Sequence, residues 1–158
     1  MKFETTLLAV KDMSKSLAFY KEIFDQDIKI DLGWNKTLTC GLTLQENFDK
    51  LLDFPKENMK FKTYNMEMYF ETEDMDSFME QLRNHPEVEI VHELKTYPWK
   101  QRVIRIFDPD YHIIEVGESM KSIAFKEFKK GLSVEEVVKE IEHPFDIVNN
   151  WYKEYNEC

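Results

Sequence analysis

The stretch Val10-Lys-Asp-Met-Ser-Lys-Ser-Leu-Ala-Phe-Tyr20 marks the passage from a strand to a helix. Before it, Phe3 to Val10 is rich in Thr, Leu and Val, as β-strands are. Asp12 and Ser14 are residue types that cap helix N-termini. An amphipathic helix over about 14–25 is predicted by the apolar side chains that recur at helical spacing, which are Leu17, Phe19, Tyr20, Ile23 and Phe24.

The same passage recurs 62 residues later, at Asp74-Met75. In front of it, Tyr64–Thr72 alternates apolar and polar side chains, which predicts a strand with one apolar face. Behind it, a helix is predicted by apolar residues at helical spacing, which are Met75, Phe78, Met79 and Leu82. Further strands are predicted after both helices, at Ile28–Leu32 and Thr37–Leu44 in the first half and at Val88–Leu94, Arg102–Phe107 and Tyr111–Val116 in the second.

This doubled order predicts an α+β fold of two βαβββ modules, roughly 1–46 and 63–118, which together form one domain over 1–118. The segment 45–62 between the modules is polar and contains Pro55, and it predicts a connection with one helical turn.

Residues 119–158 carry only helix signals, so we expect a C-terminal helical extension. A helix near 120–130 is closed by Gly131, and Ser133 with Glu136 forms a capping box for the next helix. The apolar stripes of Val134–Ile141 and Phe145–Tyr155 need a surface to cover them, which favours a homodimer.

The balance of charge excludes several kinds of partner. Among 158 residues, 21 basic and 31 acidic side chains give a formal net charge of −10, which repels nucleic acids and anionic membranes. The extension faintly resembles a helix-turn-helix, but from residue 117 onward six lysines stand against nine acidic residues, so a DNA-binding regulator is disfavoured. Cys40 and Cys158 form no metal-binding or disulfide pattern, and the chain holds no run of 18 apolar residues, so we expect a cytoplasmic protein.

Together with Val10 to Tyr20, the phrase Phe107-Asp-Pro-Asp-Tyr-His-Ile-Ile-Glu-Val116 resembles the glyoxalase/bleomycin-resistance/dioxygenase superfamily, also called vicinal oxygen chelate proteins. The resemblance covers residues 3–118. It implies paired modules whose strands surround an open cleft of mixed sheets, with a divalent metal on the cleft floor and a small molecule as ligand.

The resemblance also implies four ligand positions, one on the first and one on the last strand of each module. Here these positions fall on Thr5, Glu67, Glu115 and a residue near Thr43. Thr5 stands where many members have histidine, so we expect Glu67 and Glu115 to hold a divalent ion only weakly. Glu115, beside apolar residues, is also the candidate catalytic base; the alternative for it is an ion pair with Arg102 or Arg105.

The expected substrate-binding residues are Thr5, Thr43, Trp34, Tyr69, Trp99 and Arg102. Aromatic rings with an arginine suit a planar or anionic ligand, although Trp99 fits core or dimer packing equally well and hairpin aromatics such as Trp34 are common. Two functions remain open. One is a metal-dependent lyase or isomerase resembling lactoylglutathione lyase, and the other is a non-catalytic binder such as a bleomycin-type resistance protein.

Overall fold

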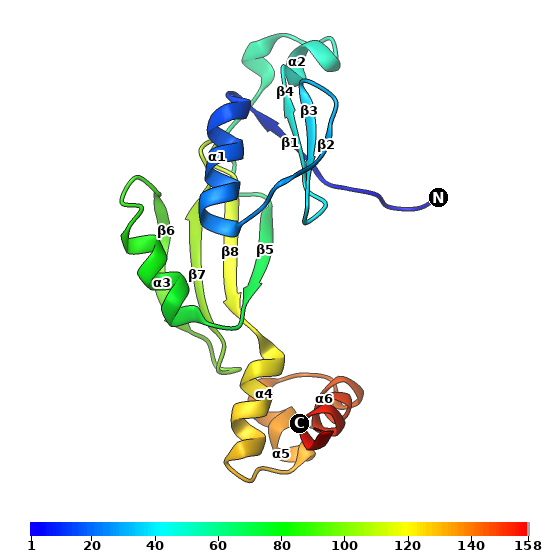
Figure 1. Cartoon of the computed structure of the whole chain (residues 1–158), viewed down its shortest axis with the longest axis vertical. Helices are drawn as coiled ribbons and strands as arrows, with labels where there is room; N and C mark the ends of the chain where they lie inside the picture. Colours follow the sequence, from blue (N-terminus) through cyan, green and yellow to red (C-terminus); the bar gives the residue numbers. More distant parts are fainter. Residues whose placement is uncertain (158) are drawn as a thin grey trace. The chain divides into compact units, whose positions relative to one another are not determined.

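The computed structural model describes residues 1–157. The chain forms two compact units, each built on one four-stranded sheet (Figure 1). Unit 1 comprises residues 1–67, 87–89 and 107–113, and unit 2 comprises residues 68–86 and 90–106 and the chain from 114 onward. This architecture confirms the predicted α+β class with two modules and C-terminal helices.

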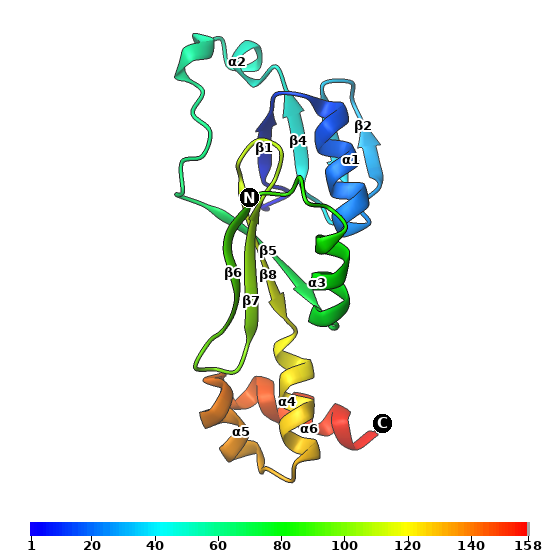
Figure 2. The ribbon, with the colours of Figure 1, turned by 90° about the vertical axis from the view of Figure 1, so that its left-hand side faces the viewer.

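Sheet A, in unit 1, has the strand order β1-β4-β3-β2. β1 pairs with β4 in parallel, whereas β4 with β3 and β3 with β2 are antiparallel, so the sheet is mixed. Helix α1 lies alongside sheet A in Figures 1 and 2. The elements are β1 (Leu7–Val10), α1 (Met13–Phe24), β2 (Ile28–Asp31), β3 (Asn35–Leu38) and β4 (Thr43–Glu46).

One prediction for unit 1 is wrong. The single strand expected over Thr37–Leu44 is a hairpin, because the chain turns between β3 and β4. Gly41 adopts a φ of +92°, which favours glycine, and its N–H donates to the carbonyl of Leu38 at 2.9 Å. The hairpin supplies the third strand after the helix and completes the βαβββ order of the first module.

The capping signals at α1 are confirmed. The Asp12 side chain accepts the N–H of Lys15, and Asp25 ends the helix in the left-handed conformation. On the inner face of the helix, Tyr20 is fully buried and donates its hydroxyl to Oδ2 of Asp108 at 3.1 Å. Burial, followed by the charge of Asp108, raises the pKa of Tyr20 well above its usual value, so this hydroxyl stays a donor.

Sheet B has the order β5-β8-β7-β6, and α3 lies alongside it (Figure 2). In β5, Met68 and Phe70 are half-buried while Glu67, Tyr69 and Glu71 are exposed, which confirms the predicted alternation. Strand bounds differ from the predicted ones by two or three residues at several ends. The elements are β5 (Glu67–Thr72), α3 (Met75–Arg83), β6 (Ile90–Thr96), β7 (Arg102–Phe107) and β8 (Ile113–Glu118).

The connection between the modules contains two short helical pieces, α2 (Phe48–Leu51) and the 3₁₀ turn η1 (Lys56–Asn58), where the sequence predicted one helical turn. No helix among residues 1–157 is long and apolar enough to cross a membrane. Cys40 is exposed and free, and Cys158 lies outside the described residues.

The C-terminal extension, here called the tail, consists of α4 (Met120–Lys129), α5 (Val134–Ile141) and α6 (Phe145–Glu157) (Figure 2). Ser133 and Glu136 form the predicted capping box at the start of α5. The three helices pack on one another around Ile123, Phe128, Val137, Ile141 and Val148. The predicted stripe of α5 is therefore largely covered within the tail, whereas in the stripe of α6 Val148 is buried and Phe145 and Tyr152 remain exposed.

Candidate functional site

Two of the predicted site residues meet through their hydroxyl groups: Thr43 on β4, and Thr5, which lies before β1 because the strand expected from Phe3 begins only at Leu7. The Oγ1 atoms of Thr5 and Thr43 lie 2.9 Å apart, and Oγ1 of Thr43 lies 3.0 Å from that of Thr37. Thr43 is 3 % exposed, so its hydroxyl depends on these partners. Thr5 also donates to the carbonyl of Gly41 at 2.7 Å. The result is a neutral chain of hydroxyls.

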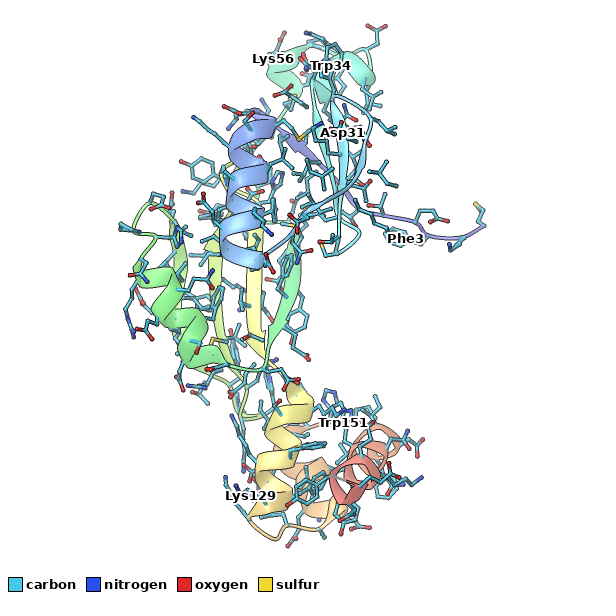
Figure 3. The ribbon with its side chains drawn as sticks, in the orientation of Figure 1. Phe3, Asp31, Trp34, Lys56, Lys129 and Trp151 are labelled. Atoms are coloured by element: carbon cyan, nitrogen blue, oxygen red, sulfur yellow. The ribbon has the colours of Figure 1, made fainter. Side chains whose placement is uncertain are left out.

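Strands β3 and β4 carry a second neutral contact. Asn35 on β3 lies opposite Gln45 on β4, and Nδ2 of Asn35 donates to Oε1 of Gln45 at 2.8 Å. Trp34 lies beside this pair in the turn between β2 and β3 and is 57 % exposed (Figure 3). The Nζ of Lys50 lies 5.5 Å from the centroid of its indole ring.

On sheet B, Glu115 is engaged by a cation. Its Oε2 forms an ion pair with Nη2 of Arg105, which is one of the two alternatives that the sequence left open. Nη1 of Arg105 lies 3.0 Å from the Tyr97 hydroxyl and 3.0 Å from Nε2 of His92. The side chains of Arg105 and Glu115 are only 22 % and 14 % exposed, so the pair is partly shielded from solvent. The guanidinium thus connects β6, β7 and β8.

From Tyr97 the contacts continue to the other predicted aromatic residues. Tyr97 stacks on Trp99 with ring centroids 4.6 Å apart. The indole N–H of Trp99 donates to Oε1 of Gln101 at 3.0 Å, and Nε2 of Gln101 donates to the Tyr69 hydroxyl at 3.1 Å. Tyr69 in turn donates to Oε2 of Glu71 at 3.1 Å. Residues Glu115, Arg105, Tyr97, Trp99, Gln101, Tyr69 and Glu71 form what we call the sheet B network.

Tyr69 is held protonated in this network. Burial of the phenol and the neighbouring charge of Glu71 raise its pKa to about 12. Its hydroxyl therefore remains a hydrogen-bond donor to Glu71 at neutral pH and does not serve as a base.

Arg102, which was also predicted to bind substrate, is not part of the sheet B network. Its Nη1 donates to Oδ1 of Asp76 on α3 at 2.7 Å, and its Nε donates to Oε2 of the buried Glu118 at 3.0 Å. Glu118 and Glu115 are three residues apart on β8, so their side chains leave opposite faces of the sheet. The arginine on the face of Glu115 is Arg105.

The sequence analysis named Glu115, Tyr69 and Trp99, and named Arg105 with Arg102 as possible ion-pair partners of Glu115, but it did not name Gln101. A usable signal existed, because residues 101, 103 and 105 point to one face of β7 by simple alternation, whereas Arg102 points to the other. The partners themselves depend on strand order, which places β7 between β6 and β8.

Comparison with known proteins gives the family. Residues 3–121 match the family model of the glyoxalase-like domain. The chain belongs to this family. No protein of curated function matches it.

Several solved structures of similar fold accompany that match. A protein of unknown function from Agrobacterium tumefaciens has 32 % sequence identity and a TM-score of 0.65, over 75 % of this chain and 94 % of that one. A fosfomycin resistance protein from Listeria monocytogenes has 21 % identity and a TM-score of 0.58, over 75 % and 93 %. A lactoylglutathione lyase from Agrobacterium tumefaciens has 21 % identity and a TM-score of 0.54, also over 75 % and 93 %. The last two likenesses show the fold alone.

The donor set of this glyoxalase-like chain does not fit a tightly held divalent metal. Thr5 and Thr43 offer hydroxyls that already bond to each other, and Glu115 is paired with Arg105. Glu67 is exposed at the start of β5. Among residues 1–157, no three His, Cys, Asp or Glu side chains are grouped so that they could hold a metal ion.

Proposed function

We propose that this glyoxalase-like protein binds a small organic molecule at the sheet B network, and that it does so without a resident metal. The observation that carries the proposal is the ion pair between Arg105 and Glu115. A carboxylate that neutralises a guanidinium has less charge to offer a metal, and a metal at Glu115 would be repelled by Arg105. This favours the ligand-binding alternative over a metal-dependent lyase or isomerase.

The network has the chemistry of a binding surface. Its arginine supplies a planar guanidinium, which an anionic ligand would bind by replacing Glu115, and the stacked rings of Tyr97 and Trp99 present flat apolar area beside it. Such a combination suits a planar or anionic organic ligand. The names of two similar structures, a fosfomycin resistance protein and a lactoylglutathione lyase, also point to small polar ligands.

The second candidate is the metal-dependent enzyme, which the resemblance of Glu67 and Glu115 to family ligand positions supports. In that case Glu115 serves as ligand or base, and divalent binding is weak and exchangeable because imidazole ligands are absent at position 5. Arg105 would have to release Glu115 for this role.

The deciding experiment is a metal analysis of protein purified without chelators or a metal-binding tag, followed by titration with Mn²⁺ and Ni²⁺. We expect far less than one metal per chain and weak, reversible binding. Glu115→Gln tests the ligand role, and Glu80→Gln on the exposed side of α3 is the matched control. Tight, stoichiometric metal that Glu115→Gln removes and Glu80→Gln retains would establish the second candidate instead.

Ligand binding is tested directly by thermal shift with a panel of small carboxylates, phosphonates and aromatic acids. Arg105→Met should abolish the stabilisation that an anionic ligand produces, whereas Arg83→Met, an exposed arginine at the end of α3, should leave it unchanged. Equal loss of stabilisation in both variants would contradict a role for Arg105.

A further inference from the structure

A pocket of about 520 Å³ lies in unit 2 between the exposed side of β5 and the tail. The residues used in the argument below are Tyr69, Glu71, Glu73, Gln101, His143 and Trp151. A smaller hollow of about 260 Å³ shares Gln101 and His143 and reaches Trp99. His143 and Trp151 come from the tail, beyond residue 121 where the match to the glyoxalase-like domain ends. The tail therefore gives this chain a pocket that the family domain alone does not provide.

One wall of the pocket is aromatic. Trp151 projects from α6 on the side of the tail that lies toward sheet B (Figure 3). The imidazole of His143 stacks on its indole, with ring centroids 5.2 Å apart and planes inclined by 27°. Tyr69 adds a phenol ring from β5. Aromatic faces carry partial negative charge and attract cations.

The lining of the pocket is also acidic. Glu71 accepts the hydroxyl of Tyr69 at 3.1 Å, and Glu73 accepts the hydroxyl of Ser122 at 3.0 Å. Within the described part of the chain, the partners of these two carboxylates are hydroxyls, which leave their charges uncompensated. The lysine of the pocket, Lys121, forms an ion pair with Glu154. The pocket thus keeps a net negative charge, in a protein whose overall charge is −10.

The Gln101 side chain, which lines the pocket, has little capacity for new hydrogen bonds. The Gln101 amide already donates to the Tyr69 hydroxyl and to the carbonyl of Glu118, and its oxygen accepts from Trp99. A ligand that offered many donors and acceptors would have to break this set. A ligand that brings charge and apolar surface without directional hydrogen bonds fits better.

We propose that this pocket binds a quaternary ammonium compound. Its charge would lie against the rings of Trp151 and Tyr69 and near the carboxylates of Glu71 and Glu73, and its methyl groups would need no hydrogen-bond partner. A pocket of this volume is in the usual range for small-molecule sites. The pocket shares Tyr69, Glu71 and Gln101 with the sheet B network, but neither Arg105 nor Glu115, at the other end of that network, lines it.

The test uses choline as the probe and its neutral isostere 3,3-dimethylbutan-1-ol as the comparison. Binding is followed by NMR on the indole N–H signals of Trp34, Trp99 and Trp151, with each titration matched for ionic strength by sodium chloride. We expect choline to shift the Trp151 signal in a saturable way and to leave Trp34, in the hairpin of sheet A, unshifted. The isostere should bind at least about tenfold more weakly.

Substitutions test which side chains of the pocket contribute to choline binding. Glu73→Gln should weaken choline binding roughly threefold to tenfold. Glu135→Gln, which removes an exposed charge from the start of α5, is the matched control. It should change the affinity for choline by less than about twofold, because salt screens an exposed charge that does not line the pocket. Trp151→Leu should abolish saturable binding, and its fold is checked by the persistence of the Trp34 and Trp99 signals.

Three results would overturn the proposal. They are no saturable shift at Trp151 with choline, equal affinity for choline and its neutral isostere, and equal effects of Glu73→Gln and Glu135→Gln. These readouts do not depend on metal content. The choline titration probes the Trp151 side of the shared residues, whereas the thermal shift with Arg105→Met probes the opposite end of the sheet B network, so failure of one proposal can be distinguished from failure of the other.

Discussion

At the scale of single residues, Gly117 on β8 shows how closely sheet B is packed. A Cβ atom at this position would meet Nε2 of Gln101 at 2.7 Å and Cε2 of Tyr69 at 2.8 Å, both closer than real contacts allow. An added Cβ would therefore force these side chains to move, and Gln101 is held in place by hydrogen bonds to Trp99, Tyr69 and Glu118. Gln101 and Tyr69 also line the pocket between β5 and the tail, so a side chain at position 117 would disturb both the packing of sheet B and that pocket.

We predict that Gly117→Ala destabilises the protein by about 1–3 kcal/mol, the usual cost of forcing extra volume into a packed site. Chemical denaturation measures it. In a Gln101→Ala background the nearest clashing atom is gone, so the same substitution should cost clearly less. Equal costs in the two backgrounds would show that the contact with Gln101 does not limit this site.

Single residues also mark where sequence reasoning succeeds and fails. Asp12, Asp74 and Ser133 are predicted caps and are observed to accept backbone N–H groups, because capping depends only on neighbours along the chain. The partner of Glu115 was left between Arg102 and Arg105. Which one it is depends on the sheet face that each arginine occupies, and alternation alone determines this once the strand bounds are known.

At the scale of elements, Glu118 connects its own strand β8 with β7 and α4, and through Arg102 with α3. Its buried carboxylate on β8 accepts from Arg102 on β7, whose Nη1 also reaches Asp76 on α3, and from Lys126 on α4. Burial alone would raise the pKa of Glu118, but the hydrogen bonds from Arg102 and Lys126 outweigh it and hold the pKa below its usual value. The tail is thus joined to sheet B by charge as well as by packing.

We predict that Glu118→Gln lowers the free energy of unfolding by about 1–3 kcal/mol at neutral pH. Because the folded-state pKa is lowered, the stabilising effect of the charge is complete above the unfolded-state pKa, about 4.3, and is lost as the pH falls through the folded-state value. The difference between wild type and variant, followed by urea denaturation from pH 7 downward, should therefore shrink in acid.

Asp76→Asn is the control, since it removes the other carboxylate that Arg102 contacts. Its side chain is 81 % exposed, so we expect a cost below about 1 kcal/mol. A larger cost for Asp76→Asn than for Glu118→Gln would contradict the importance that we assign to the buried partner.

Some details of the helices and strands could not be predicted from the sequence. The doubled βαβββ order was visible because helix caps and strand alternation are local signals. The β3–β4 hairpin was missed because Thr37–Leu44 reads as one β-rich run, and the single glycine in it, Gly41, is a weak signal for a turn. The role of the tail was not visible, because its contribution of His143 and Trp151 to a pocket depends on tertiary packing.

At the scale of the whole molecule, charge limits the partners of the tail. From residue 117 onward six lysines face nine acidic residues, and α6 carries Lys153 as its lysine. We predict no sequence-specific DNA binding, because affinity for duplexes comes largely from neutralised phosphates. Fluorescence anisotropy with a random-sequence duplex pool should show no salt-dependent binding at nanomolar protein. Selection of a discrete sequence from that pool would contradict this.

The homodimer, by contrast, needs a reason other than the tail stripes, since Val137, Ile141 and Val148 are covered within the tail. Sheet A offers one. Its edge strand β2 is exposed along its whole length, with Ile28 and Ile30 45 % and 48 % exposed and Leu32 just beyond it 71 % exposed. Apolar edge strands in solution tend to be covered by another strand or chain.

We therefore predict a dimer in which this edge is buried, with a sedimentation mass of twice the 19.1 kDa chain at micromolar concentration. Ile30→Lys should shift the mass toward one chain, because a lysine on an edge strand must then be desolvated in the interface. Ile147→Lys, which places the same charge on the exposed side of α6, is the matched control and should leave the mass unchanged. A mass near one chain across the micromolar range for the wild type would rule out the dimer, and loss of the dimer in Ile147→Lys alone would move the interface from sheet A to the tail.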